Sequence, residues 1–146
     1  MSPGLWAPKI LILDDDHVTA QMVYAALRAQ GYDCLLAHDG AQGWKLAQAE
    51  APDALITDLM MPGEHGFQVI RRIKSDPQLR KMKIIVMSGS GSPQIMRAEA
   101  TRQGVDAFFD KPFPPQELVA ALRRLLGSDA SVSAPREQTG DRIVLP

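Results

Sequence analysis

The sequence predicts an α/β protein in which a central five-stranded parallel sheet carries helices on both faces, a doubly wound (βα)5 arrangement. Three observations favour it: short apolar runs recur five times, each run is continuous rather than alternating, and a longer amphipathic stretch follows each run. Continuous apolar runs are typical of strands that are buried on both faces. Strands that alternate with helices indicate a parallel sheet, because a parallel pair needs a long crossover connection.

The five predicted strands are short and consist almost entirely of apolar residues. They are Ile10–Leu13, Cys34–Ala37, Ala54–Thr57, Ile84–Met87 and Ala107–Phe109. Between them the apolar residues recur with helical spacing. The stripe of the first helix consists of Val18, Met22, Ala25 and Ala29 and is closed by Gly31. A later stripe consists of Phe67, Ile70, Ile73 and the stem of Lys74, and the last one of Leu118, Ala121, Leu122 and Leu125.

The last helix also carries start and stop signals. Pro115 stands near its first turn, Glu117 follows closely, and Gly127 comes just after the end of the apolar stripe. Proline at the start and glycine beyond the end are the expected punctuation of a helix. We therefore expect one (βα)5 domain over residues 8–127, preceded by a lead-in over residues 1–7. Residues 128–146 are rich in Ser and Ala, with Pro, Gln, Thr and Gly, which predicts a flexible tail or the stump of a linker.

Composition excludes several classes of protein. The chain has 146 residues, one cysteine (Cys34) and three scattered histidines, which argues against a disulfide framework and a cysteine-based zinc site. No run approaches about 18 apolar residues, and no secretory signal precedes the first strand, so we expect a cytoplasmic protein without a membrane span. Lysine and arginine total 16, and aspartate and glutamate total 17. This near-neutral balance argues against direct, sequence-independent binding of nucleic acid.

Polar side chains follow the predicted strands at the point where each strand ends. In an open parallel sheet the carboxyl ends of the strands share one edge, and ligands bind there where the winding reverses. The residues that the sequence places at this edge are Asp14, Asp15, Asp16, Asp58, Ser88 and Lys111.

Three of these residues, Asp14, Asp15 and Asp58, would repel one another strongly if they met. Two carboxylates about 4 Å apart repel by about 4 kcal/mol at an effective dielectric constant near 20. A hard divalent cation with oxygen ligands relieves such repulsion, and Mg²⁺ suits a site with one or two carboxylates, waters and a phosphate. Lys111 adds a positive charge and Ser88 a hydroxyl donor. The set fits phosphoryl transfer to a carboxylate, which needs a nucleophile and nearby cations.

Four segments resemble the signature blocks of the response-regulator receiver domain of two-component signalling. They are Ile10–Asp16, Leu55–Gly63, Val86–Gly89 and Phe109–Phe113. The resemblance extends over residues 8–127 and implies a flavodoxin-like fold and a phosphorylation-controlled signalling switch. It implies that the domain is not an enzyme in the usual sense and catalyses only its own phosphorylation and dephosphorylation.

The resemblance also implies a role for each residue at the sheet edge. Asp58 would be the phosphoacceptor, which takes a phosphoryl group from the phosphohistidine of a sensor histidine kinase or a phosphotransfer protein. Asp15 and Asp58 would bind Mg²⁺ directly with the backbone carbonyl of Met60, and Asp14 mostly through water. Lys111 would pair with a phosphoryl oxygen.

The same resemblance implies a switch made of Ser88 and Phe108. Ser88 would donate to a second phosphoryl oxygen and move towards it, and Phe108 would then turn inward into the vacated space. This movement would reshape the face formed by the fourth helix, the fifth strand and the fifth helix, where a downstream protein would bind. The chain has Ser at 88 and Phe at 108 where the family often has Thr and Tyr. The Lys111–Pro112 peptide is often cis in the family.

Other interpretations stay open at this point. A pseudo-receiver that binds partners without phosphorylation would share the fold. The Asp14-x-Asp16-x-Val18 pattern also fits the opening of haloacid-dehalogenase-like phosphatases, although the later acidic pair of those enzymes is absent from the sequence. A flavodoxin-like electron carrier would share the topology, but three aspartates would repel the flavin phosphate. Asp16 itself is expected to cap the first helix. The domain could be a stand-alone receiver or a fragment of a longer regulator or hybrid kinase.

Overall fold

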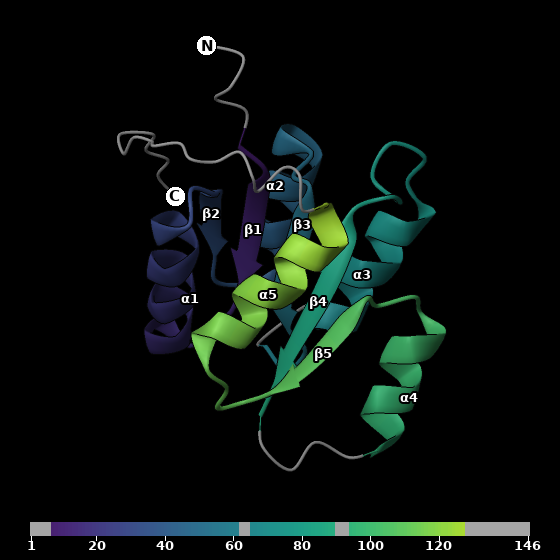
Figure 1. The fold of residues 1–146 in the computed structure, drawn as a ribbon. Helices are drawn as coiled ribbons and strands as arrows, with labels where there is room; N and C mark the ends of the chain where they lie inside the picture. Colours follow the sequence, from purple (N-terminus) through teal and green to yellow (C-terminus); the bar gives the residue numbers. More distant parts are fainter. Residues whose placement is uncertain (1–6, 62–64, 90–93, 128–146) are drawn as a thin grey trace.

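A computed structural model describes residues 7–61, 65–89 and 94–127. Within them, five parallel strands form one sheet in the order β2-β1-β3-β4-β5, with helices on both faces (Figure 1). The predicted doubly wound (βα)5 fold is therefore confirmed. The predicted tail over residues 128–146 and the lead-in, except for Ala7, lie outside the described residues.

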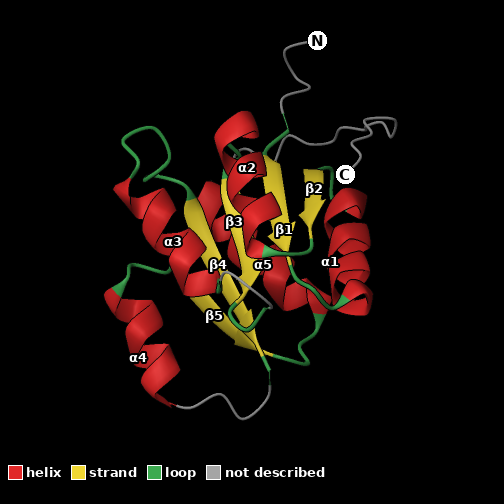
Figure 2. Ribbon diagram, turned by 180° about the vertical axis from the view of Figure 1, so that it is seen from behind, coloured by secondary structure: helices red, strands yellow, loops and turns green. Residues whose placement is uncertain are grey.

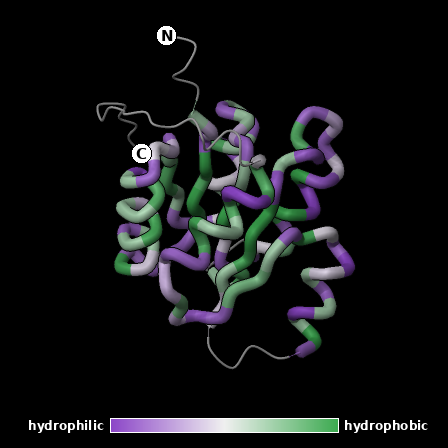
Figure 3. The backbone as a smooth tube through the Cα atoms, viewed as in Figure 1, coloured by the Kyte–Doolittle hydropathy of each residue, from purple (hydrophilic) through white to green (hydrophobic). Residues whose placement is uncertain are grey.

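Each strand agrees with a predicted apolar run to within one residue at either end. The bounds are β1 Lys9–Leu13, β2 Asp33–Ala37, β3 Ala54–Asp58, β4 Lys83–Ser88 and β5 Ala107–Asp110. The first four are buried along nearly their whole length, while the edge strand β5 is half-buried. Figure 3 accordingly colours the central strands mostly as hydrophobic. Burial on both faces explains why the runs are continuous in the sequence.

Helices divide between the two faces of the sheet. Their bounds are α1 His17–Ala29, α2 Gly40–Glu50, α3 Gly66–Ser75, α4 Gln94–Arg102 and α5 Pro115–Leu126. One core lies under α1 and α5, and the other under α2, α3 and α4 (Figures 1 and 2). Alternate residues of β1 enter opposite cores, as the two-residue period of a strand requires. Ile10 and Ile12 belong to the core under α1 and α5, and Leu11 and Leu13 belong to the core under α2, α3 and α4.

The stripe predicted for the first helix is wrong, because it lies on the outer face of α1. Val18 is 79% exposed and Met22 is 39% exposed, whereas the residues that face the sheet are Ala20, Val23 and Leu27. The other members of the predicted stripe, Ala25 and Ala29, are also exposed. Both sets fit a helical period, and the set with Val23 and Leu27 is buried. Tyr24 also packs against the core on the face of Val23 and Leu27, so packing against the sheet selects that face.

The stripes predicted for the two later helices are correct. In α3, Ile70 and Ile73 are buried and Phe67 is half-buried. In α5, the buried residues include Leu118, Ala121 and Leu122, and Leu125 packs against the same core. The helix begins at Pro115, as predicted, and Gly127 follows its end with φ 96°. Among the described residues, no helix has the length and apolar character needed to span a membrane.

Two valines of α1 test which face of this helix packs against the sheet. Val23→Ala should lower the free energy of unfolding by about 2 kcal/mol, because it leaves a cavity at a fully buried position. Val18→Ala, the matched control on the exposed face, should change it by less than about 0.5 kcal/mol. Urea denaturation of both variants measures the difference. A larger loss for Val18→Ala would mean that the helix packs through the opposite face.

Candidate functional site

The carboxyl ends of β1 and β3 form the centre of the site. These strands are neighbours although α1, β2 and α2 separate them in the sequence, so the winding of the chain reverses between them. Leu13 pairs with Thr57, which places Asp14 and Asp58 at the same level of the sheet. The structure thus brings together, at one edge, acidic residues that lie more than forty positions apart in the sequence.

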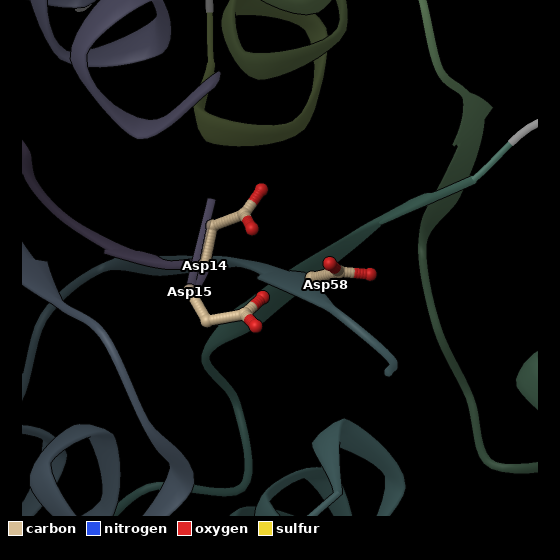
Figure 4. Close-up of side chains that lie close together, drawn as sticks. All are labelled: Asp14, Asp15 and Asp58. Atoms are coloured by element: carbon tan, nitrogen blue, oxygen red, sulfur yellow. The ribbon is translucent and has the colours of Figure 1, made fainter. Parts of the chain in front are cut away.

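Asp14, Asp15 and Asp58 gather closely at this edge. One carboxylate oxygen from each lies within 4.8 Å of the oxygens of the other two (Figure 4). Asp14 is fully buried and Asp58 is 7% exposed, whereas Asp15 is exposed to solvent. The cluster therefore has a buried side and an open side, and a small ligand can reach it from Asp15.

Lys111 enters the same cluster from the segment between β5 and α5. Its Nζ lies 2.9 Å from Oδ2 of Asp14 and 3.2 Å from Oδ2 of Asp58. Its backbone N–H donates to the carbonyl oxygen of Ser88 at 2.7 Å, which fixes the lysine to the end of β4. The Lys111–Pro112 peptide is cis, in agreement with the resemblance to the receiver family. One ammonium group therefore bridges carboxylates at the ends of two adjacent strands.

Burial and charge oppose each other in this cluster. Burial raises the pKa of Asp14 above its usual value, although the hydrogen bond and the charge of Lys111 act in the other direction. Burial alone would lower the pKa of Lys111, but its hydrogen bond to Asp14 and the charges of Asp14 and Asp58 outweigh burial and raise it. The lysine thus stays protonated. One ammonium group facing three carboxylates leaves excess negative charge, which a divalent cation would neutralise.

The donor set fits a hard metal ion. Carboxylate oxygens at an open edge are the ligands that Mg²⁺ prefers, and Asp15 and Asp58 present theirs within 4.8 Å of each other. Both carboxylate oxygens of Asp14 already accept hydrogen bonds within the protein. Its Oδ1 accepts from the N–H of Asp16 at 2.9 Å, and its Oδ2 accepts from Lys111. Met60 lies next to the cluster, and its N–H points to Oδ1 of Asp58 at 3.3 Å.

Ser88 lies at the same edge, at the end of β4. It follows Met87, which pairs with Asp58 in the sheet, and it is 2% exposed. Asp16, by contrast, serves the helix: its side chain accepts from the N–H of Val18 at 3.1 Å and from the Thr19 hydroxyl at 2.7 Å. The expectation that Asp16 caps the first helix is confirmed. Asp16 is not among the three acidic residues whose oxygens gather at the sheet edge.

Phe108 lies apart from the acidic cluster, in the middle of β5. It pairs with Val86 and packs half-buried against the core under α2, α3 and α4. The guanidinium group of Arg97, on α4, stands over its ring at 4.3 Å from the ring centre. Sequence reasoning missed Arg97, because helical spacing does not reveal which strand residue a polar helix residue meets.

Two further residues near the site were not predicted from the sequence. Gly66 begins α3, and a Cβ there would overlap the carbonyl oxygen of Asp58, so only glycine allows this close approach. His38 follows β2, and its Nδ1 lies 3.0 Å from the carbonyl oxygen of Asp14 while its ring stacks on His17 at 4.0 Å. The strand-end rule could have found His38, since it directly follows a predicted strand.

Comparisons with known proteins agree with this arrangement. The family described as "Response regulator receiver domain" matches residues 10–123. The chain is 34% identical over 117 residues to the phosphate regulon transcriptional regulatory protein PhoB of Pseudomonas aeruginosa, which covers 80% of this chain and 51% of that protein. It is 33% identical over 118 residues to the response regulator MprA of Mycobacterium avium, which covers 81% of this chain and 50% of that protein. The chain spans about half the length of these curated relatives.

Solved structures show the same fold over nearly their whole length. The chemotaxis response regulator CheY4 of Vibrio cholerae has a TM-score of 0.76 at 28% identity, covering 82% of this chain and 99% of that one. The receiver domain of the sensor histidine kinase PA1611 of Pseudomonas aeruginosa PAO1 has a TM-score of 0.75 at 28% identity, covering 83% of this chain and 98% of that one. That structure holds a magnesium ion coordinated in its active site cleft.

These matches confirm the resemblance that the four sequence segments carry. The family is one of signalling switches in two-component systems rather than of classical enzymes. The chain belongs to the response regulator receiver domain family.

Proposed function

We propose that this domain is a phosphorylation-controlled switch in which Asp58 accepts a phosphoryl group from the phosphohistidine of a histidine kinase or a phosphotransfer protein. The observation that carries the proposal is the position of Lys111, whose Nζ stands 2.9 Å from Asp14 and 3.2 Å from Asp58. An ammonium group held there can stabilise the negative charge of a phosphoryl group that arrives at Asp58.

In the proposed reaction, a carboxylate oxygen of Asp58 attacks the phosphorus atom of the phosphohistidine. A P–O bond forms as the P–N bond breaks, and the leaving imidazole nitrogen keeps the electron pair and takes up a proton. The product is an acyl phosphate on Asp58, whose phosphoryl group carries about two negative charges in place of the single charge of the carboxylate. Lys111 pairs with one phosphoryl oxygen, and Ser88 donates its hydroxyl to another. The near-complete burial of Ser88 at the neighbouring strand end supports this role.

Asp15, Asp58 and the backbone carbonyl of Met60 would hold Mg²⁺ in this proposal, with Asp14 acting mostly through water. The ion supplies positive charge where the phosphoryl oxygens gather negative charge. The carboxylate oxygens that lie within 4.8 Å of one another support this site. The magnesium-bound structure of the related kinase receiver domain supports it independently.

The proposed output is a change on the face formed by α4, β5 and α5, read by a downstream protein. Ser88 and Asp110 pair in the sheet, so a movement of Ser88 towards the phosphoryl group acts directly on β5, which carries Phe108. Relatives such as PhoB are named as transcriptional regulators and are about twice as long as the aligned segment. For the domain itself, we propose control through protein contact rather than through direct binding of nucleic acid.

Phosphorylation by a small donor tests the acceptor. Incubation with Mg²⁺ and acetyl phosphate should add one phosphoryl group to the wild-type protein and none to Asp58→Asn, as measured by intact mass. Asp39→Asn is the matched control, because Asp39 lies at the same edge but caps α2 by accepting the N–H of Gln42 at 2.8 Å. It should react like the wild type. Equal labelling of Asp58→Asn and wild type would reject Asp58 as the acceptor, and no labelling of either would favour a pseudo-receiver.

Thermal denaturation with and without Mg²⁺ tests the metal site. The ion should stabilise the wild-type protein, by about 2.7 kcal/mol at a concentration about 100 times its dissociation constant. Asp15→Asn should lose most of this stabilisation, because it replaces an exposed carboxylate of the cluster with a neutral amide. Asp16→Asn is the control: asparagine caps a helix as well as aspartate does, so its response to Mg²⁺ should stay unchanged. If Asp16→Asn lost the stabilisation by Mg²⁺ and Asp15→Asn kept it, Asp15 would be rejected as a ligand of the metal.

A further inference from the structure

Helix α4 is attached to the sheet by few buried side chains. Of its residues, Ala100 is the only buried one, and Ile95 is 71% exposed. Met96 is partly buried against the core under α2, α3 and α4. Figures 1 and 2 show α4 at the β5 side of the sheet. Apolar burial supplies most of the free energy that holds a helix to a sheet, and α4 has little of it, so contacts made by its polar residues add to its attachment.

Arg97 makes two such contacts with β5. Its guanidinium group stands 4.3 Å from the centre of the Phe108 ring and forms an ion pair with the carboxylate of Asp110. Phe108 and Asp110 are two residues apart on one strand, so both side chains point to the same face, where α4 lies. The guanidinium group therefore links a ring and a carboxylate of the same strand from a single position on the helix.

The geometry suits arginine in particular. A planar guanidinium group can lie over an aromatic ring while its N–H groups reach a carboxylate, whereas an ammonium group is a point charge. Phe108 has no hydroxyl group through which a neighbour could hold it. About half of each ion-pair side chain is exposed, 44% for Arg97 and 48% for Asp110, so the ion pair alone contributes little. The same guanidinium group makes the ion pair and the ring contact.

We propose that Arg97 and Asp110 form a clamp that holds Phe108 in its half-buried position and ties α4 to β5, and that this clamp opposes the switched conformation. The second part rests on the proposed function. When the ring turns inward towards Ser88, it leaves the guanidinium group, so the free energy of the clamp adds to the cost of switching. Phosphorylation shifts the equilibrium between the resting and switched conformations only as far as the phosphoryl group interacts more favourably with the switched one. Removing the clamp therefore makes switching easier.

The contact itself is tested in the resting protein. The chain has four phenylalanines, so labelling with fluorophenylalanine gives four ¹⁹F signals, and Phe108→Leu identifies that of Phe108. Arg97→Ala and Asp110→Ala should both shift this signal, and Arg97→Lys should shift it less than Arg97→Ala. The control is Arg102→Ala, which removes an exposed arginine and its ion pair with Glu99 from the same helix. An unchanged Phe108 signal in Arg97→Ala and Asp110→Ala would overturn the clamp.

The coupling is tested with beryllofluoride, a mimic of the phosphoryl group whose bound ¹⁹F signal can be integrated directly. Arg97→Ala should reach half-saturation at about two- to fivefold lower concentration than wild type, as expected for the loss of a cation–π contact at a partly exposed site. Arg102→Ala should match wild type, and Arg97→Ala should have no further effect in a Phe108→Leu background. If Arg97 has only a structural role, Arg97→Ala should lower stability in urea without changing the beryllofluoride concentration at half-saturation. This result would overturn the coupling.

The two measurements separate failure of the clamp from failure of the proposed function. If wild-type protein and Asp58→Asn bind beryllofluoride equally, the phosphoacceptor assignment fails, and the coupling fails with it. The resting ¹⁹F spectra still decide whether Arg97 holds Phe108, because they need no phosphoryl mimic. If Asp58 is required and Arg97→Ala binds the mimic as the wild type does, the clamp has no part in switching. Asp110→Ala repeats the comparison should Arg97→Ala fold poorly.

Discussion

The ammonium group of Lys111 is the constraint on which the site depends. Asp14 is fully buried and Asp58 nearly so, and a buried carboxylate without a cationic partner is strongly destabilising. Lys111 lies within hydrogen-bonding distance of both, and its backbone is bound to Ser88. One side chain therefore joins the ends of β1 and β3 to the segment after β5. The same charge that stabilises the resting cluster is available to an incoming anion at Asp58.

This arrangement disfavours the fully ionised cluster, and the rest of the fold offsets that cost. Burial raises the pKa of Asp14, so its ionised form is less favourable in the folded protein than in the unfolded chain. The folded protein holds the proton of Asp14 more tightly than the unfolded chain does. The free energy of unfolding therefore falls as the pH rises from the usual pKa of an aspartate through the raised pKa of Asp14. The compensation comes from two apolar cores, which bury four strands on both faces. A cluster of like charges is tolerated because it lies at the end of a well-buried sheet.

The edge of the sheet could be predicted from the sequence to a large extent. The carboxyl ends of parallel strands must share one edge, so Asp14, Asp58 and Lys111 could be placed together without coordinates. The buried face of α1 could not, because two sets of apolar residues fit the helical period and only packing against the sheet selects Val23 over Val18. Contacts between a polar helix face and a strand depend on how the helix is set on the sheet. Side-chain spacing does not contain this information.

The register of β4 connects the two parts of the molecule that the proposals concern. Met87 pairs with Asp58 on β3, and the next residue, Ser88, pairs with Asp110 on β5. Ser88, which in the proposed function moves towards a phosphoryl group on Asp58, is therefore paired with the strand that carries Asp110, the partner of Arg97. In the proposed switch, a local change in charge needs no long path to reach α4, because one strand separates the acceptor from the clamp. Close-packed neighbours of this kind respond by changing arrangement rather than by deforming gradually.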